Sequence, residues 1–247
     1  MLEFYDLNEV SQQYLLILSD IYDHFDHISS PRNMMIRESL DYGFRINNPE
    51  SGPITTLSQD RNEKIKKYTQ KEMELYLSGT DSAKDFSKAS KFWLSLANPD
   101  GSVNSAYGNL IWKQNSHGNS VYEHIMRTPW EWAVDSLKQD KDTRQAILRF
   151  NLPEHAWRGN KDFPCTMHGN FNIRNNKLNF SIVMRSNDVV KGLVYDMPFF
   201  IHLMDMMIDE LKDTYPDLKK GTYFHMAHSM HMYEKDVDVV KKMLRRD

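Results

Sequence analysis

Hydrophobic positions recur every three or four residues along the first half of the chain. Between residues 10 and 25, leucine, isoleucine and tyrosine side chains keep this spacing, which predicts an amphipathic helix. The sequence SSPRN at 29–33 then ends that helix at a proline and begins a polar loop, and NNPESGP predicts an irregular segment over 47–58. Three further stretches have a helical pattern: 62–77, which is followed by the helix-ending Ser78-Gly79, 82–96 and 120–139.

After residue 142 the pattern changes to short apolar and alternating stretches. Residues 146–150 predict a short strand, and 167–173 and 178–184 alternate as strands with one buried face do. Asn175 and Asn176 lie between the last two strands and tolerate positive φ, so a tight hairpin is expected. The remaining predicted elements are a Met-rich apolar helix over 197–211, a strand near 223–226 and a charged C-terminal helix over 237–246.

These elements predict an α+β fold in which helices pack on a mainly antiparallel sheet. The 247 residues, of which 40% are hydrophobic and 12% aromatic, suffice for one large core. A formal net charge of −3 gives no general attraction for nucleic acid. We therefore expect a single domain over residues 1–247 that has no nucleic-acid partner.

Cysteine usage and the N-terminal sequence bear on location. A single cysteine allows no internal disulfide, which is typical of a reducing compartment. The N-terminal MLEFYDLNEV carries acidic residues where a signal peptide needs basic ones. No apolar run approaches the roughly 20 residues that span a bilayer. We expect a cytoplasmic protein without a membrane partner.

The one cysteine, Cys165 in KDFPCTMHGN, is either a small buried side chain or a nucleophile. A catalytic thiolate needs nearby positive charge, because the pKa of a free thiol is about 8.5. The predicted hairpin brings Arg185, in MRSND, near the same end of the sheet. Arg185 and Ser186 together offer a planar donor fork and a hydroxyl, which suit a phosphate. Arg185 in a surface ion pair is the alternative, and the spacing leaves both interpretations open.

Three histidines in HMAHSMH, namely His225, His228 and His231, raise the possibility of a zinc site. A strand would place residues three apart on opposite faces of the sheet. We therefore expect no metal there.

The run PCTMHGNFNIRNNKLNFSIVMRSNDVVKGLVYD resembles the pyrimidine C5-modifying enzymes of the thymidylate synthase superfamily, and is most similar to the phage deoxycytidylate hydroxymethylases. The shared elements are a Cys that opens a β-hairpin, then Arg-Ser-x-Asp, a Gly four residues after that Asp, and a His-x-Tyr near the C-terminus. Three upstream segments match in the same order: Ser30-Pro31-Arg32, Asn104-Ser105-Ala106-Tyr107-Gly108 and Asp142-Thr143-Arg144. The resemblance covers about residues 32–233.

The resemblance implies a sheet covered by helices, with one sheet face used for dimerisation, and an obligate homodimer. Cys165 would add to C6 of a pyrimidine nucleoside monophosphate, and C5 would receive a one-carbon unit from 5,10-methylenetetrahydrofolate. The implied substrate-binding residues are Arg32, Arg144 from the partner subunit, Arg185, Ser186, Asn187, Asp196, His231 and Tyr233. The implied cofactor-binding residues are Asp188 and Gly192.

Two further catalytic roles follow from the resemblance. Glu72, in KEMEL, would order water and proton transfer at the base, and Tyr107 would line the site beside Cys165. On spacing alone Glu72 is a solvated residue on a helix, and Glu74 takes its role if the register differs.

Asp196, in LVYDM, bears on the choice of base. Thymidylate synthases have asparagine at this position, whereas the deoxycytidylate hydroxymethylases have aspartate. A carboxyl group can accept from cytosine N4–H₂ and, when protonated, donate to N3. The alternative is that Asp196 caps the helix predicted over 197–211. Together with the other motifs, Asp196 favours a cytosine nucleotide, with dCMP as the preferred substrate.

The product depends on whether hydride or water completes the reaction. The chain ends in LRRD, without the apolar tail with which the synthases close over the folate and exclude water, and this favours hydroxymethylation. Thr166 replaces the histidine that follows the cysteine in the synthases, which agrees with that choice. Gln145 replaces the second arginine of the family's Arg-Arg pair, which removes one charge from the phosphate site.

Several alternatives stay open at this point. The enzyme could act on the ribonucleotide CMP, since nothing in the sequence decides between deoxyribose and ribose. It could act on dUMP as a hydroxymethylase or methylase. The chain could also be a non-catalytic homologue that only binds a nucleotide.

Overall fold

The computed structural model of the chain describes residues 3–4, 7–113 and 127–246. Its helices are α1 (Leu7–Asp23), α2 (Gln59–Ser78), α3 (Ala83–Phe86), α4 (Trp93–Leu96), α5 (Tyr107–Trp112), α6 (Pro129–Gln139), α7 (Leu193–Leu211) and α8 (Val237–Leu244). Its strands are β1 (Glu3–Phe4), β2 (His27–Ser29), β3 (Ile36–Asn47), β4 (Ile147–Arg149), β5 (Thr166–Arg174), β6 (Lys177–Met184), β7 (Asn187–Asp188) and β8 (Lys219–Tyr233).

All these strands join one mixed sheet, in the order β1-β3-β8-β6-β5-β4, with β2 beside β3 and β7 beside β8. The β3–β8 and β5–β6 pairs are antiparallel, whereas β6 and β7 run parallel to β8. Asn175 and Asn176 close the β5–β6 hairpin with φ values of 50° and 58°, as a tight turn of this type requires. The predicted α+β fold is confirmed, and so is the hairpin.

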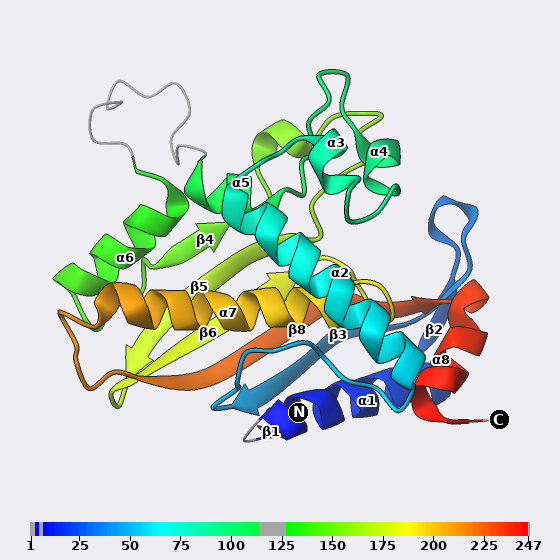
Figure 1. Cartoon of the computed structure of the whole chain (residues 1–247), viewed down its shortest axis with the longest axis horizontal. Helices are drawn as coiled ribbons and strands as arrows, with labels where there is room; N and C mark the ends of the chain where they lie inside the picture. Colours follow the sequence, from blue (N-terminus) through cyan, green and yellow to red (C-terminus); the bar gives the residue numbers. More distant parts are fainter. Residues whose placement is uncertain (1–2, 5–6, 114–126, 247) are drawn as a thin grey trace.

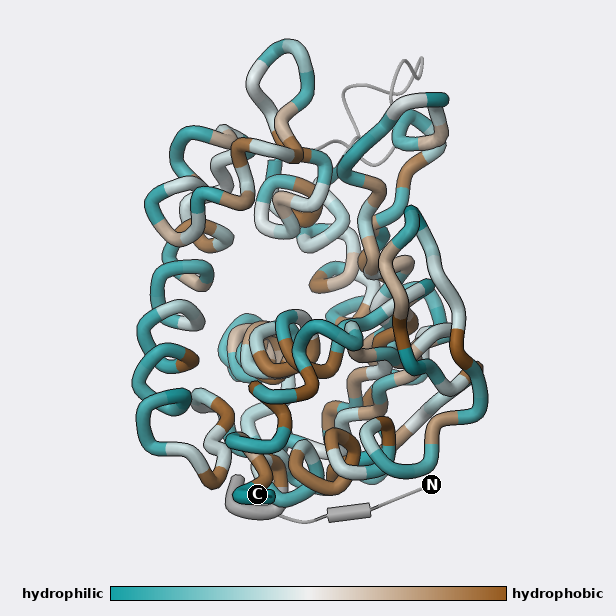
Figure 2. Tube along the Cα trace, turned by 90° about the vertical axis from the view of Figure 1, so that its right-hand side faces the viewer, coloured by the Kyte–Doolittle hydropathy of each residue, from teal (hydrophilic) through white to brown (hydrophobic). Residues whose placement is uncertain are grey.

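The helices stack in layers on one face of the sheet (Figure 1). Helix α7 lies on β6 and β8, and α2 packs over α7. From the side, the mostly hydrophilic α2 lies at the left and α7 runs between it and the sheet (Figure 2). Alternate residues of β5 and β6, such as Phe171 and Phe180, are fully buried beneath these helices. Their neighbours, such as Asn172 and Asn179, are only half-buried on the other face.

Most of the helices predicted from periodicity are present, with shifted ends. The pattern over 62–77 lies within α2, which ends with Gly79 in the left-handed conformation at φ 69°. The pattern over 82–96 is broken into α3 and α4, because serine hydroxyls there bond to nearby carbonyl groups, as Ser87 does with Lys84. The prediction over 120–139 corresponds to α6 from Pro129 onward, and residues 120–126 lie outside the described residues.

The start of α7 corrects one interpretation of the sequence. The helix was predicted over 197–211, but it begins at Leu193, after Gly192 at the capping position. Asp196 therefore lies inside the first turns of the helix, and its interpretation as the helix N-cap is wrong. Its side chain is available for the site.

Two strands are longer than the sequence pattern predicted. Strand β8 has 15 residues, where only 223–226 was expected, and the 12-residue β3 was not predicted. Charged residues interrupt the alternation of β3, and some of their partners come from distant parts of the chain, as Glu234 does for Arg37 and Ser229 does for Glu38. Arg37 Nε donates to Glu234 Oε1 at 2.7 Å, and Ser29 Oγ donates to Glu38 Oε1 at 2.6 Å. These partners make it possible to place charges on a central part of the sheet.

No helix among the described residues is long and apolar enough to cross a membrane.

Candidate active site

Cys165 and Arg185 stand at the open end of the β5–β6 hairpin. Cys165 directly precedes β5, and the Arg185 amide donates to the Cys165 carbonyl at 2.8 Å. The Arg185 guanidinium donates to the carbonyl oxygens of Phe163, at 2.6 Å, and Pro164, at 3.1 Å. One of its nitrogens, Nη2, also lies 3.5 Å from Cys165 Sγ. The hairpin therefore fixes a positive charge against the thiol, and the alternative of a surface ion pair for Arg185 does not fit these contacts.

Burial and the nearby charges shift the pKa of the Cys165 thiol in opposite directions. Burial raises the pKa of Cys165, and this is the largest influence on it. Arg185 and Arg32 lower the pKa, whereas Asp196 and Asp162 raise it. The thiolate thus depends on the two arginines for its stabilisation.

Arg32 reaches the site from a distant loop. It lies in the 3₁₀ turn Pro31–Asn33 with a φ of 53°, a left-handed conformation that is rare for arginine. Its charge lowers the pKa of both Cys165 and Tyr233, so its guanidinium lies at their end of the sheet. With Arg185 and the half-buried Ser186 it forms a group of cationic and hydroxyl donors.

Arg144 is not part of this group. It is exposed in the loop between α6 and β4, and within the described part of the chain no hydrogen bond or ion pair holds its guanidinium. The structure of one chain therefore brings together all the predicted phosphate ligands except the one expected from a partner subunit.

The half-buried Asp196 and the buried Asn187 form a polar pair near the cysteine. Asn187 Nδ2 donates to Asp196 Oδ2 at 2.7 Å, while Asn187 Oδ1 is buried without a partner among the described residues. Burial raises the pKa of Asp196 to about 6; the bond from Asn187 lowers it, and the nearby Asp188 raises it. A part of the Asp196 population is therefore protonated near neutral pH.

Gly192 and Asp188 shape the turn that leads into α7. A Cβ atom on Gly192 would lie 2.9 Å from the Asp188 carbonyl and 3.0 Å from Asn187 Nδ2, so only glycine leaves room for this packing. Asp188 Oδ1 accepts from the amides of Val190, at 2.8 Å, and Lys191, at 3.2 Å. Burial raises the pKa of Asp188, and His231 lowers it.

Glu72 points into the interior from α2 and is 7% exposed. Its pKa is raised to about 8, first by burial and second by the charge of Asp196. Hydrogen bonds from Tyr68 and Tyr76 act in the opposite direction. Glu74 of the same helix is exposed. The register with Glu72 in the site is therefore the one that the structure favours.

Tyr107 connects α5 to the cysteine. Its hydroxyl accepts from the Thr166 amide at 3.4 Å, and its ring stacks on Tyr76 at 5.4 Å. The next residue, Gly108, allows this contact, since a Cβ there would lie 1.7 Å from the Tyr76 carbonyl oxygen. Thr166 Oγ1 is buried and has no partner among the described residues.

His231 and Tyr233 lie at the end of β8, beside β7. Their rings meet edge to face with centroids 5.4 Å apart, and His231 pairs in register with Asp188. His225 is fully buried and bonds to Tyr223, whereas His228 is exposed and bonds to Asp41. Among the described residues, no group of three or more His, Cys, Asp or Glu side chains could hold a metal ion.

Two residues next to Glu72 were missed from the sequence. Tyr68 donates to Glu72 Oε1 at 2.9 Å, and Trp93 Nε1 donates to the Tyr68 hydroxyl at 3.1 Å. Tyr68 precedes Glu72 by one helical turn, a spacing that could have indicated the first contact. No local pattern indicates the second, since Trp93 comes from α4.

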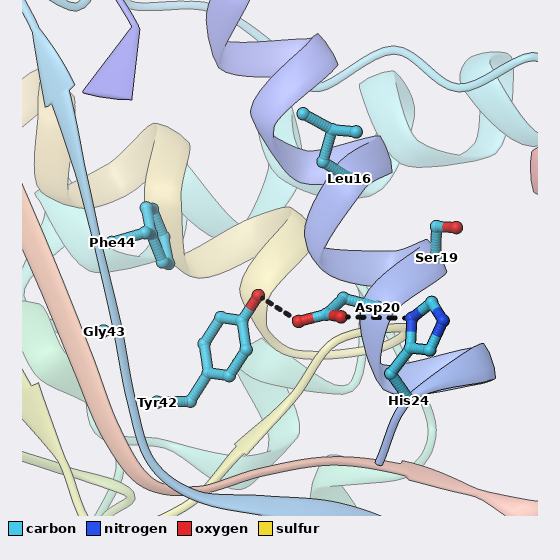
Figure 3. Close-up of a pocket in the computed structure, with 7 residues that line it drawn as sticks. All are labelled: Leu16, Ser19, Asp20, His24, Tyr42, Gly43 and Phe44. Atoms are coloured by element: carbon cyan, nitrogen blue, oxygen red, sulfur yellow. Dashed lines mark hydrogen bonds and ion pairs between the residues drawn. The ribbon is translucent and has the colours of Figure 1, made fainter. Parts of the chain in front are cut away.

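A separate cavity of about 440 Å³ lies between α1 and β3 (Figure 3). Within it Asp20 accepts from the Tyr42 hydroxyl at 2.9 Å, and His24 lies 3.4 Å from the same carboxylate. None of its lining residues belongs to the group around Cys165.

A sequence model of the family described as thymidylate synthase matches residues 12–247. The chain belongs to the thymidylate synthase family. It is 29% identical to the deoxycytidylate 5-hydroxymethyltransferase of Enterobacteria phage T4 over 68% of this chain and 67% of that protein. It is 28% identical to the deoxyuridylate hydroxymethyltransferase of Bacillus phage SP01 over 92% of this chain and 57% of that protein.

A more distant relative of the same family is a putative thymidylate synthase of Methanococcoides burtonii, 22% identical over 92% of this chain and 88% of that protein. The resemblance predicted from the motifs is thus confirmed at the level of the family, and the chain is a thymidylate synthase-like transferase. The names of the two phage relatives differ in the base, so they leave the choice of base to the residues of the site.

Proposed function

We propose that the chain is a deoxycytidylate 5-hydroxymethyltransferase, in which dCMP, 5,10-methylenetetrahydrofolate and water become 5-hydroxymethyl-dCMP and tetrahydrofolate. The observation that carries this proposal is the pair of Asp196 and Asn187, whose hydrogen bond measures 2.7 Å. Residues 1–247 act as one catalytic domain in this proposal, because a single hydrophobic core runs from Val10 to Met243.

The Asp196–Asn187 pair suits cytosine. Cytosine presents an N4–H₂ donor and an N3 acceptor. The Asn187 amide turns its nitrogen to the carboxylate, which leaves Oδ1 as an acceptor for N4–H₂. A pKa of about 6 for Asp196 provides the protonated carboxyl that donates to N3. Uracil presents an N3–H donor and an O4 acceptor. Its O4 would face the Asn187 Oδ1, which is also an acceptor, so one of these hydrogen bonds would be lost.

The nucleophile and its neighbours suit addition at C6. The Cys165 thiolate forms a bond to C6, the C5–C6 π pair becomes a C4–C5 π bond, the C4–N3 π pair moves to N3, and N3 takes a proton from Asp196. Arg185, Ser186 and Arg32 hold the 5′-phosphate, and the charges of the two arginines also stabilise the thiolate. His231 and Tyr233 hold the sugar hydroxyl. C5 of the resulting enamine is the carbon nucleophile.

The chain has residues that fit a reduced folate. Asp188 keeps one oxygen, Oδ1, on the backbone amides of Val190 and Lys191. Its second oxygen can accept from the N–H groups of a pterin, and Gly192 keeps the turn tight beside it. Bound there, methylenetetrahydrofolate supplies a one-carbon unit at the oxidation level of formaldehyde.

Water addition accounts for the proposed hydroxymethyl product. Glu72, with a pKa raised to about 8, can accept a proton from water and return it. Thr166 Oγ1 is a buried hydroxyl without a partner among the described residues, directly after Cys165, and such a group commonly holds water. The hydroxymethyltransferase relatives of both phages support the same product.

The site is completed, in this proposal, by a second copy of the chain. The sheet face turned away from α7 presents half-buried side chains along its length, including Asn172, Asn179, Phe224 and Met226. Two such faces can pack against each other about a two-fold axis. Arg144, exposed on its loop, then reaches the partner's phosphate group, and Gln145 leaves that contribution with a single charge.

A uracil enzyme is the main competitor, because the relative from phage SP01 matches more of the chain than the relative from phage T4. Asp196 and Asn187 argue against it. Deoxyribose is the preferred sugar in this proposal, and CMP is the second candidate substrate among the cytosine nucleotides.

Mass spectrometry of products decides among these functions. The protein is incubated with methylenetetrahydrofolate and each of dCMP, CMP and dUMP separately. We expect a gain of CH₂O on dCMP. A gain of CH₂ would make the enzyme a methylase, reaction of CMP would change the sugar, and reaction of dUMP alone would overturn the assignment of the base. Binding of dCMP without any product would support a non-catalytic homologue.

A further inference from the structure

We infer that the hydrogen bonds from Trp93 to Tyr68 and from Tyr68 to Glu72 keep Oε1 of Glu72 as an acceptor and so leave Oε2 to carry the proton that Glu72 exchanges with the reacting water. Tyr68 is a positioning residue in this arrangement, since it acts through Glu72. The inference deepens the proposed function and rests on it for its kinetic consequences.

The direction of the two hydrogen bonds follows from the donor and acceptor groups of Trp93, Tyr68 and Glu72. An indole N–H can only donate, and a phenol has one proton to give. Trp93 Nε1 donates to the Tyr68 oxygen at 3.1 Å, so the Tyr68 proton is directed to Glu72 Oε1 at 2.9 Å. Oε1 therefore acts as an acceptor in both protonation states of Glu72. Any proton that Glu72 carries sits on Oε2.

Ring packing among helices α2, α3, α4 and α7 holds this geometry. The Tyr68 ring lies 4.4 Å from Tyr195 on α7, next to Asp196, and Trp93 packs against Phe86 at 4.7 Å. Neither ring can turn without losing these contacts. These contacts thus connect Glu72, through Tyr68, to α7, the helix that presents the Asp196 carboxyl group to the base.

The titratable groups around Glu72 come from α2, α5 and α7. On α2 they are Tyr68 and Tyr76, and on α7 they are Asp196, whose charge raises the Glu72 pKa, and Tyr195. From α5, Tyr107 stacks on Tyr76. Tyr68 is the one whose proton direction is fixed by a second donor. Removing its hydroxyl therefore changes the orientation of Glu72 as well as its charge balance.

The test uses Tyr68→Phe and Trp93→Phe in the full chain. Tyr68→Phe keeps the ring and removes the proton, so the pKa of Glu72 rises and kcat on dCMP falls about tenfold, with KM changed little. Trp93→Phe gives a smaller loss, because the Tyr68 hydroxyl remains but is free to turn. The double variant loses no more kcat than Tyr68→Phe alone, since both substitutions act through the same pair of hydrogen bonds.

Tyr42→Phe is the matched control. Its hydroxyl donates to Asp20 at 2.9 Å, the same pairing of tyrosine and carboxylate, in the separate cavity between α1 and β3 (Figure 3). This variant should leave kcat and the Glu72 pKa unchanged.

Carboxyl ¹³C NMR gives a readout that needs no turnover. The Glu72 signal is identified by its absence in Glu72→Gln, and its titration is compared in the wild type, Tyr68→Phe and Tyr42→Phe. A higher pKa in Tyr68→Phe alone supports the inference, even if no pyrimidine reacts and the proposed function fails. An unchanged pKa, or additive losses in the double variant, would overturn it.

Discussion

Arg185 is bound to Cys165 twice, through its amide at 2.8 Å and through Nη2 at 3.5 Å from the thiol sulfur. The first bond belongs to the β5–β6 hairpin, and the second places a charge on the reactive atom. Strand pairing and electrostatics of the nucleophile are thus set by the same residue. Carbonyl groups of Phe163 and Pro164 hold the guanidinium at this position even before a phosphate arrives.

Replacement of Arg185 should weaken the thiolate. We expect Arg185→Gln to raise the pKa of Cys165 further, because a nearby positive charge is lost while burial remains. Cys165 is the only cysteine in the chain, so the rate of alkylation by iodoacetamide against pH reports it alone. Arg174→Gln, at the far end of the same hairpin, is the control. Equal alkylation profiles for the two variants would show that Arg185 does not stabilise the thiolate.

The base preference should depend on Asp196. We expect Asp196→Asn to change the ratio of kcat/KM for dCMP to that for dUMP by about tenfold or more toward dUMP, because an amide can donate to O4 and accept from N3–H. Asp209→Asn, at an exposed position on the same helix, should leave the ratio as it is. The assignment of cytosine fails if the two variants give the same ratio.

The sequence predicted best those features that depend on neighbouring residues. The hairpin turn at Asn175 and Asn176 and the end of α2 at Gly79 need only a local conformational preference. Strand β3 was not predicted, because Arg37 interrupts its apolar pattern and finds its partner, Glu234, 197 residues away. A local sequence pattern does not show an ion pair between residues so far apart in the chain.

The same distinction applies to the site. Cys165, Arg185 and Asp196 lie within one hairpin and the following helix, so a contiguous motif indicated them together. The contact of Trp93 with Tyr68 joins residues 25 apart on different helices, and it became visible only in the fold. Asp196 had two interpretations in the sequence, and the start of α7 at Leu193 removed one of them.

Glu72 should reduce stability at alkaline pH. Its pKa is about 8 in the folded chain, against an ordinary value of 4.5, so the folded state binds its proton more tightly than the unfolded state does. The free energy of unfolding therefore falls as pH rises from about 4.5 to 8. Glutamine does not ionise, so Glu72→Gln should be more stable than wild type at pH 9 by on the order of 1 kcal/mol, and nearly equal at pH 5.

Urea denaturation at both pH values measures this difference. Glu74→Gln, on the exposed side of the same helix, should show no such dependence. A constant difference between Glu72→Gln and wild type at the two pH values would mean that Glu72 is not buried in its neutral form.

Arg144 should act on the partner's site. Cys165→Ala and Arg144→Ala should each abolish or strongly reduce turnover as pure proteins, while both remain folded. After unfolding and refolding as an equal mixture, half of the dimers pair one variant with the other, and one of their two sites has both native residues. About a quarter of the wild-type activity should then return. If Arg144 instead serves the site of its own chain, every site in the mixed dimer lacks one residue, and no activity returns. Sedimentation of the mixture establishes that dimers have formed, so that lost activity cannot be mistaken for lost assembly.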